Sequence, residues 1–376
     1  MEARANVTHA RARLTIDLGA IVANWKRLGV LAQPAEVAAV VKADAYGLGL
    51  RPVASALASA GCTTFFVAHA SEGSSLRQIL RDGGHTASIY ILHGGPLEAA
   101  GFELYRSHDL RPVLASLPEL DFWASALKYP GVLPASAVHF DTGMNRLGLR
   151  EADVEAARAV SPTLVMSHFI ASEIASDPLN RVQMARFARL RSAFPNAKAS
   201  LANSSGIFLG PEALHDLVRP GFALYGGNPC PSLANPMLPI VQLDVPMLQI
   251  RDVGAGETIG YGAGFTARRP MRLAILPLGY ADGFARSGGA MDAGPEQGAL
   301  ALVEGYACRF VGRVSMDLTV IDVSAVPEAL LQPGVMAQVL GQAISIDDLA
   351  SATRRIGYEV LTGLGQRFER VYRTAS

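Results

Sequence analysis

The sequence predicts an α/β fold in which a (β/α)8 TIM-like barrel is followed by a mostly β C-terminal domain. Over the first two thirds of the 376 residues, eight short apolar runs alternate with segments of helical periodicity. No GxGxxG motif follows the first run, and the count of eight favours the barrel over a doubly wound sheet, the competing fold. Further along the chain, short β-type runs are divided by glycine-rich turns, which predicts the second domain.

The expected elements follow one another in a regular order. The candidate strands of the barrel cover residues 37–42, 64–68, 88–93, 111–115, 137–141, 164–168, 199–202 and 217–220. Helical periodicity between them is clearest over residues 19–32, 51–61, 72–84 and 180–194. In the second domain, helical patterning is sparse apart from the stretch around residues 346–353.

A proline-rich segment marks the expected boundary between the domains. NPCPSLANPMLP, residues 228–239, holds four prolines in twelve residues, which is the composition of a linker. We therefore assign residues 13–235 to the barrel and residues 236–376 to the β domain. Residues 1–12 stay open, as a segment that could associate with the β domain.

Composition narrows the classes of function. Lys plus Arg and Asp plus Glu number 33 each, so the formal net charge is zero, and no basic run of the kind that binds nucleic acid occurs. No stretch approaches the roughly 18 apolar residues of a membrane helix, and the basic N-terminus lacks the apolar region of a secretory signal. Three scattered cysteines argue against a disulfide framework or a thiolate metal site. These features predict a cytoplasmic enzyme without a metal, a nucleic-acid partner or a membrane partner.

Polar residues end several of the predicted barrel strands. Lys42 ends the first, Asp141 the fifth and His168 the sixth, while Arg219 lies near the end of the eighth. Arg146 follows the fifth strand in its loop. Because barrel enzymes carry their chemistry at the carboxyl ends of the strands, we expect these side chains to share one rim. A charged amine at the end of an apolar run is costly unless it is paired, solvated or chemically used. Lys42 is therefore a candidate for a group that takes part in the chemistry.

The loops after strands seven and eight have the composition of an anion site. Ser204 in ANSSG, with Gly221 and Phe222 in RPGF, offers hydroxyl and backbone donors where barrels usually bind phosphate. ANSSG as a plain helix cap is the alternative. A lysine opposite a phosphate site suggests pyridoxal phosphate held as a Schiff base. A surface lysine, or a structural ion pair between Lys42 and Asp44, remains the competing interpretation.

Arg219 adds a detail that bears on the type of reaction. Many pyridoxal enzymes place a carboxylate on the pyridine nitrogen to keep it protonated. An arginine can only donate a hydrogen bond, so the nitrogen beside Arg219 would stay neutral and the ring would be a weaker electron sink. Such a site suits a brief deprotonation at the α-carbon of an amino acid.

The motifs in both domains resemble those of the alanine racemase family. The first domain contains VVKADAYG, HFDTGMNRLG, SHF, ANSSG and RPGFALYG in the family's order, and the second contains GYGAGF, GYADG and GRVSMD. The resemblance spans nearly the whole chain. It implies a pyridoxal 5'-phosphate-dependent isomerase and a homodimer in which the β domain of one chain completes the active site of its partner.

The resemblance also implies roles for individual residues. Lys42 would carry the cofactor and act as the base on one face of the substrate, with Tyr261 of the partner chain as the base on the other. His168 would link Arg219 to Tyr261, and Arg146 and Met316 would contact the substrate. The implied cofactor contacts are Lys42, Tyr46, Arg146, His168, Asn203, Ser204, Arg219, Gly221, Phe222 and Tyr280. Residues at the entrance to the site would be Glu173, Arg286, Arg313 and Gln366.

Three positions depart from the family pattern. His139 stands where many members carry a lysine whose carbamate orients the arginine equivalent to Arg146, so His139 itself or a bound anion is left to hold Arg146. Ser315 replaces a common cysteine, and Gln366 replaces a tyrosine that narrows the entrance in some members. These changes affect the mouth of the site more than its chemistry.

Racemisation of L-alanine and D-alanine is therefore the expected activity, either to supply D-alanine for cell-wall peptidoglycan or to catabolise it. A serine or broad-specificity racemase on the same scaffold is the alternative. A diamino-acid decarboxylase is disfavoured, because those relatives use a cysteine-bearing partner loop and GYGAGF supplies Tyr261 instead. A non-catalytic pyridoxal phosphate carrier is disfavoured because such proteins resemble the first domain alone.

Overall fold

The computed structural model describes residues 12–126, 134–292 and 298–374. By their contacts, these fall into two compact units: one comprises residues 18–238, and the other combines the N-terminal strand with residues from 239 onward. Residues 1–11, which the sequence analysis left open, lie outside the described residues. Within the described residues, no helix is both long and apolar enough to cross a membrane.

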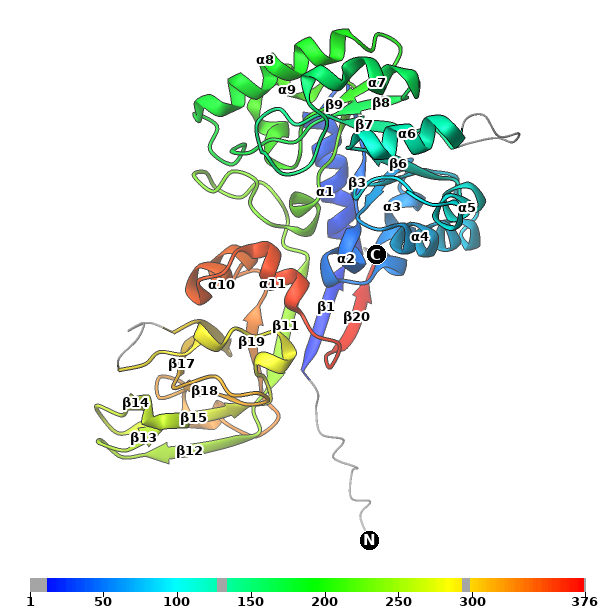
Figure 1. Cartoon of the computed structure of the whole chain (residues 1–376). Coiled ribbons are helices and arrows are strands. Elements are labelled where there is room, and N and C mark those ends of the chain that lie inside the picture. The colour runs from blue at the N-terminus through cyan, green and yellow to red at the C-terminus, as the bar shows by residue number, and fades with distance from the viewer. Residues whose placement is uncertain (1–11, 127–133, 293–297, 375–376) are drawn as a thin grey trace. The chain divides into compact units, whose positions relative to one another are not determined.

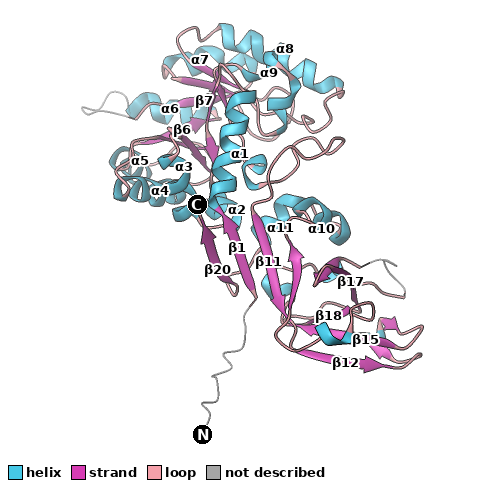
Figure 2. Ribbon diagram, turned by 180° about the vertical axis from the view of Figure 1, so that it is seen from behind, coloured by secondary structure: helices cyan, strands magenta, loops and turns pink. Residues whose placement is uncertain are grey.

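The first unit is the barrel (Figures 1 and 2). Its parallel strands are β2 (Glu36–Val37), β3 (Ala39–Val40), β4 (Thr64–Val67), β5 (Ser88–Ile91), β6 (Leu110–Leu114), β7 (Ala137–His139), β8 (Leu164–Met166), β9 (Lys198–Ser200) and β10 (Leu217–Val218). The sheet runs in sequence order from β3 to β9, and β10 pairs with β2. Backbone hydrogen bonds from Ala38 to Val218 and from Val40 to Pro220, both of 3.0 Å, and from Arg219 to Ala202, of 2.9 Å, close the ring. All eight predicted strand positions are thus confirmed.

Helices surround these strands, as the cyan ribbons in Figure 2 show. They are α1 (Leu18–Leu31), α2 (Lys42–Gly47), α3 (Leu50–Ser59), α4 (Ala70–Asp82), α5 (Ala99–Ser107), α6 (Leu117–Ala126), α7 (Val154–Ala159), α8 (Pro178–Ser192) and α9 (Pro211–Leu214). Short 3₁₀ turns are η1 (Glu151–Asp153), η2 (Ser205–Leu209) and η3 (Phe222–Tyr225). The four predicted helices correspond to α1, α3, α4 and α8. Sequence signals explain α8: Asp177 caps it by accepting the Leu179 amide at 2.9 Å, and Pro178 occupies its first turn.

The second unit is built on one mixed sheet. Its strand order is β12-β15-β18-β17-β16-β19-β11-β1-β20. The bounds are β1 (Arg13–Asp17), β11 (Val241–Pro246), β12 (Gln249–Val253), β15 (Met271–Leu276), β16 (Leu300–Val303), β17 (Tyr306–Val311), β18 (Thr319–Asp322), β19 (Met336–Leu340) and β20 (Glu369–Arg373). A separate hairpin joins β13 (Thr258–Ile259) to β14 (Phe265–Thr266), and the helical elements are η4 (Tyr261–Ala263), η5 (Tyr280–Asp282), η6 (Arg286–Gly288), η7 (Glu328–Leu330), α10 (Ile346–Thr353) and α11 (Gly357–Gly363).

The N-terminal strand corrects the sequence-based assignment of residues 13–17 to the barrel. This strand, β1, pairs with β11 antiparallel and with β20 parallel. Its alternating Leu14 and Ile16 side chains are fully buried in the sheet of the second unit. A short strand at the start of a chain carries no signal of its distant partners, which is why the sequence pattern could not place it.

Candidate active site

Lys42 lies where the chain leaves β3 and enters a left-handed turn. The four residues that follow it, Ala43, Asp44, Ala45 and Tyr46, have φ between 53° and 57°. This conformation costs a non-glycine residue roughly 1–2 kcal/mol, so the surroundings must hold the turn. The Asp44 carboxylate helps by accepting the Leu50 amide at 2.6 Å. Among the residues that the structure describes, no ion pair joins Lys42 to Asp44, which removes one competing interpretation of Lys42.

The surroundings of Lys42 favour a reactive amine. Its side chain is half-buried, and burial lowers the pKa of the amine below its usual range. The positive charge of Arg146 lowers this pKa further, while the carboxylate of Glu72 raises it. A lysine with a lowered pKa is more readily unprotonated, and the unprotonated amine is the nucleophile and base.

Ser204 and Gly221 meet in the loops after β9 and β10, and together they are called the Ser204–Gly221 cradle. The Ser204 hydroxyl accepts hydrogen bonds from the amides of Gly221 at 3.0 Å and Ala223 at 3.1 Å. A Cβ atom at position 221 would lie 2.2 Å from the hydroxyl oxygen of Tyr46, so only glycine allows this approach. Tyr46 is buried and packs against Tyr225, with ring centroids 4.6 Å apart and ring planes tilted by 30°. Tyr46, Ser204 and Gly221 are thus brought together, with Phe222 buried beside them.

Arg219 is buried among neutral partners. Its guanidinium donates to the Ser200 hydroxyl and to the Ser167 carbonyl, the latter at 2.6 Å, and lies over the Phe66 ring. Burial lowers the pKa of Arg219 to about 9. A buried cation whose hydrogen bonds end on neutral oxygens is costly unless a ligand accepts from it, so this residue suits a ligand nitrogen or oxygen that needs a donor.

The loop that carries Arg146 is organised by Asp141. The Asp141 carboxylate accepts three amides, those of Gly143, Met144 and Asn145, each at 2.8 Å. Arg146 is exposed and lines an open polar hollow together with Asp141. Asp141, which the sequence analysis singled out at a strand end, is therefore a loop-forming residue that presents Arg146.

Two histidines near Arg219 are held neutral. Burial lowers the pKa of His139 to about 4 and that of His168 to about 3, and in both cases the charge of Arg219 is the next cause. Within the described residues, no hydrogen bond joins His139 to Arg146. The hydrogen bonds of Arg219 likewise do not end on His168, so the link through His168 stays a prediction.

Acid should therefore destabilise the cofactor-free protein through His139. Because its pKa is lower in the folded state than the ordinary value near 6.5, the unfolded state binds the proton first. Stability is unaffected above about pH 6.5 and falls as the pH drops towards 4, by about 1–2 kcal/mol at pH 5. We expect His139→Gln to reduce this fall in stability, measured as the difference between the urea midpoints at about pH 6.5 and about pH 5. His85→Gln, a control outside the site, should show the same fall in stability as the wild type. An equally large fall in His139→Gln would contradict the assignment of this effect to His139.

In the second unit, Tyr261 projects from a glycine-rich hairpin. It is 73% exposed, which is unusual for a tyrosine, and it begins η4 between Gly260 and Gly262, both with positive φ. The Arg313 side chain lies against this hairpin, because a Cβ on Gly262 would be 3.3 Å from its Nη1 atom. The structure thus brings the predicted entrance residue Arg313 beside Tyr261.

A second group of predicted residues meets around the turn η5. The amide of Tyr280 donates to the Ser315 carbonyl at 3.1 Å, and that of Ala281 donates to the Met316 carbonyl at 3.0 Å. Tyr280 and Met316 are both exposed, at 44% and 53%.

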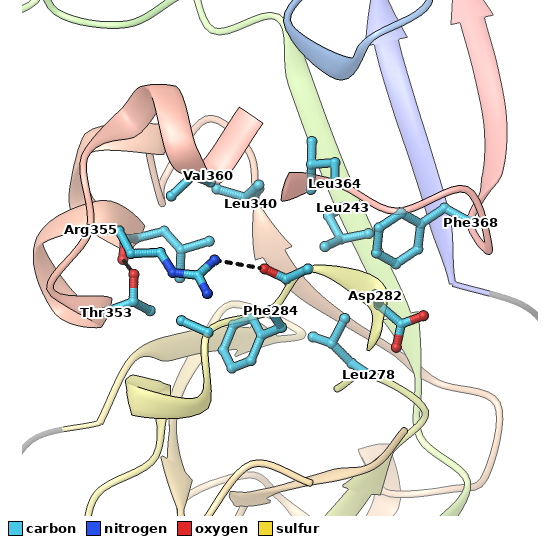
Figure 3. A pocket seen from close by; sticks show the side chains of 13 residues that line it. Leu243, Leu278, Asp282, Phe284, Leu340, Thr353, Arg355, Val360, Leu364 and Phe368 are labelled. Carbon is cyan, nitrogen blue, oxygen red and sulfur yellow. Dashed lines mark hydrogen bonds between the residues drawn. The ribbon is translucent and has the colours of Figure 1, made fainter. Parts of the chain in front are cut away.

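Arg367, next to Gln366, connects the turn η5 with the loop that carries Met316. It pairs with Asp282 and with Asp317, both at 2.7 Å. Behind η5 lies a small, mostly apolar pocket, across which Arg355 donates to the Gly283 carbonyl at 3.1 Å (Figure 3). The turn that presents Tyr280 is therefore braced from two sides.

The remaining predicted residues have less specific surroundings. Asn203 acts at least as a cap, because its Oδ1 accepts from Ser172 at 3.0 Å and from the Gly206 amide at 2.8 Å. Glu173 is exposed on the loop after β8 in the barrel, and Arg286 is exposed in η6 of the second unit.

Among the described residues, no cluster of three His, Cys, Asp or Glu side chains could hold a metal ion.

Sequence reasoning missed the residues that hold this site through the backbone. Gln183 on α8 accepts the Ile170 amide at 2.9 Å and donates to the His168 carbonyl at 2.9 Å and to Thr142 at 3.0 Å. Glu72 also accepts backbone amides, whereas Arg367 acts through the carboxylates of Asp282 and Asp317. For Glu72, its place three residues into a helix was the available signal, since a glutamate there typically accepts amides from the preceding loop.

Two family models match the chain. The one described as "Alanine racemase, N-terminal domain" matches residues 16–229, and the one described as "Alanine racemase, C-terminal domain" matches residues 240–372. A protein named alanine racemase from Methylobacterium nodulans is 49% identical over 367 residues, which cover 96% of each chain. The crystal structure of alanine racemase from Bartonella henselae with covalently bound pyridoxal phosphate is similar with a TM-score of 0.89 and 34% identity, covering 97% of this chain and 100% of that one.

Relatives with different physiological names are about equally similar to this chain. "Alanine racemase, biosynthetic" from Agrobacterium fabrum is 42% identical, covering 96% of this chain and 94% of its own length. "Alanine racemase, catabolic" from Mesorhizobium japonicum is 43% identical, covering 96% and 93%. Identity alone therefore does not separate the two physiological roles.

Proposed function

The chain belongs to the alanine racemase family, and on that premise we propose that it interconverts L-alanine and D-alanine with pyridoxal 5'-phosphate as its cofactor. The observation that carries the proposal is that one barrel holds both a half-buried, strand-end Lys42 and a buried Arg219 whose hydrogen bonds end on neutral oxygens. Both lie in the barrel, as does the Ser204–Gly221 cradle.

The residues of the barrel fit this cofactor. Lys42 would hold it covalently through the amine, and Ser204, Gly221 and Tyr46 would surround its phosphate. The Tyr46 hydroxyl lies so close to Gly221 that a Cβ there would have no room. Arg219 would donate to the ring nitrogen, and Arg146 would contact the phenolic oxygen. When bound, pyridoxal phosphate withdraws electrons from the α-carbon of an attached amino acid and so makes its proton acidic.

The protein supplies the two proton-transfer groups. Inverting an α-carbon needs one group to remove a proton on one face and another to return one on the opposite face. Lys42 would serve one face, and the lowering of its pKa by burial and by Arg146 favours the unprotonated amine. Tyr261, exposed at the tip of its hairpin, would serve the other face from a partner chain.

Arg219 would restrict the chemistry. A guanidinium donates and does not accept, so it leaves a ring nitrogen unprotonated. The weaker electron sink suits reversible proton removal more than bond cleavages that need a long-lived carbanion. Burial, and next the charge of Arg219, lower the pKa of His139 and of His168 and so keep both neutral.

We further propose that the enzyme is a cytoplasmic homodimer with shared active sites. The exposed Tyr261, Tyr280 and Met316 on loops of the second unit support a surface that meets another chain. Three free cysteines, of which Cys62 and Cys308 are buried and Cys230 is half-buried, support a reducing compartment. Supply of D-alanine for peptidoglycan and catabolism of D-alanine are both compatible with these features.

An absorbance spectrum and a racemisation assay test the proposal together. We expect a visible band from bound pyridoxal phosphate that borohydride removes, with the added mass on the peptide containing Lys42, and we expect L-alanine to be converted to D-alanine. A band without alanine turnover, but with turnover of serine, would favour the broad-specificity alternative. A protein that shows no band even after pyridoxal phosphate is added would refute the proposed function.

A further inference from the structure

Glu72 connects the turn that carries Lys42 to the neighbouring strand end. It is the third residue of α4, and both of its carboxylate oxygens accept backbone amides. Oε2 accepts those of Ala68 at 2.8 Å and His69 at 3.1 Å, where β4 leads into α4. Oε1 accepts the amide of Ala43 at 2.7 Å. One carboxylate therefore links the ends of two adjacent barrel strands.

The bond to Ala43 falls where the backbone needs support. Ala43 directly follows Lys42 and begins the left-handed turn, with φ of 53°. Asp44 holds the far end of this turn through the amide of Leu50, the first residue of α3, which follows in the same βα unit. Glu72 reaches its near end from a different βα unit, so the direction in which Lys42 leaves the backbone depends on Glu72.

Glu72 also sets the charge around the amine. Arg146, His93 and His168 all interact electrostatically with Lys42, and the pKa values of both histidines are lowered in part by its charge. Burial and Arg146 lower the pKa of Lys42, whereas Glu72 raises it. On its own turn, the carboxylate of Asp44 is bonded to the Leu50 amide. Glu72 is thus the acidic group that opposes the positive charge of Arg146 at Lys42.

We propose that Glu72 is a positioning residue for Lys42, which fixes the backbone from which the amine projects and balances the positive charge of Arg146. The catalytic significance of this role rests on the proposed function of Lys42, but the contacts themselves do not.

The barrel contains a matched control. Glu119 is the third residue of α6, and its carboxylate accepts the amides of Ala115 at 2.7 Å and Gly95 at 3.2 Å. It therefore links two adjacent βα units in the same way as Glu72, at a place that does not involve Lys42. Substitution of either Glu72 or Glu119 would lower the stability of the barrel, whereas only substitution of Glu72 should affect Lys42.

The test compares the titration of Lys42 in cofactor-free wild type, Glu72→Gln and Glu119→Gln. The rate of acetylation of Lys42 by acetic anhydride is followed against pH by mass spectrometry of its peptide, with exposed Lys26 as the internal reference. We expect the midpoint for Lys42 to fall by about one pH unit in Glu72→Gln and to stay at the wild-type value in Glu119→Gln. An unchanged midpoint in Glu72→Gln would overturn the proposal.

A second measurement separates position from charge. Glu72→Asp keeps the charge but is too short to keep both sets of amide bonds, so we expect its pyridoxal phosphate band to form at least about 10-fold more slowly, with a melting temperature close to that of Glu119→Gln. Band formation at the wild-type rate would overturn the positional part of the proposal. If the wild type forms no band while the acetylation midpoint still shifts in Glu72→Gln, the proposed function fails and the assignment of Glu72 stands.

Discussion

Lys42→Ala should abolish racemisation and the covalent attachment of the cofactor. Lys42 is the half-buried strand-end amine whose pKa is lowered by burial and by Arg146, which prepares it to act as both attachment point and base. Loss of a residue with both roles lowers turnover by about 10,000-fold or more. The measurement is the initial rate of conversion of L-alanine to D-alanine, alongside the spectrum before and after borohydride.

The same variant should keep its affinity for the phosphate of the cofactor. The cradle of Ser204 and Gly221 is held by its own hydrogen bonds, which do not involve the lysine side chain. Pyridoxal phosphate should therefore still bind to Lys42→Ala, reversibly and without a borohydride-stable mass. Lys26→Ala, at an exposed position of α1, is the control and should behave as wild type. Racemisation by Lys42→Ala within about 10-fold of the wild-type rate would show that another group is the base.

Sequence reasoning could propose the barrel half of the candidate site because the fold itself gathers distant residues. Lys42, Asp141, His168 and Arg219 each follow a short apolar run, and parallel strands bring their carboxyl ends to one rim. Periodicity and the count of strands were therefore enough to propose which side chains meet. The roles of Tyr261 and Met316 came from resemblance alone, since a tyrosine in a glycine-rich turn has no distinctive pattern of its own.

The positioning residues could not be predicted in the same way. Gln183, Glu72 and Arg367 act on backbone amides or on the acidic residues of loops. Each has a partner far away in the chain: 13 positions for Gln183 and Ile170, 29 for Glu72 and Ala43, and 85 for Arg367 and Asp282. The left-handed turn after Lys42 is equally hidden, because Ala and Tyr rarely adopt that conformation and nothing in KADAY signals it. The pairing of β1 with β11 and β20 depends on a sheet that forms only when the two ends of the chain meet. Long-range contacts of these kinds leave no local periodicity.

The surroundings of Tyr261 lead to the prediction that tests how active sites are shared. Tyr261→Phe removes the hydroxyl that would transfer the second proton, so racemisation should fall by about 100- to 10,000-fold while the cofactor band persists. Lys42→Ala and Tyr261→Phe homodimers should then both be nearly inactive, for different reasons. A dimer that contains one chain of each variant shows whether the lysine and the tyrosine of a site belong to the same chain.

Mixed dimers of these two chains should regain activity. If Tyr261 acts in the partner's barrel, a mixed dimer has one site with both substitutions and one site with neither. Random pairing makes about half of the dimers mixed, so an equal mixture that has been dissociated and reassociated should show about a quarter of the wild-type activity. If each site used its own chain's tyrosine, every site in the mixture would lack one group and no activity would return. The unmixed variants, each dissociated and reassociated alone, are the control, and activity that appears there as well would point to contamination instead of shared sites.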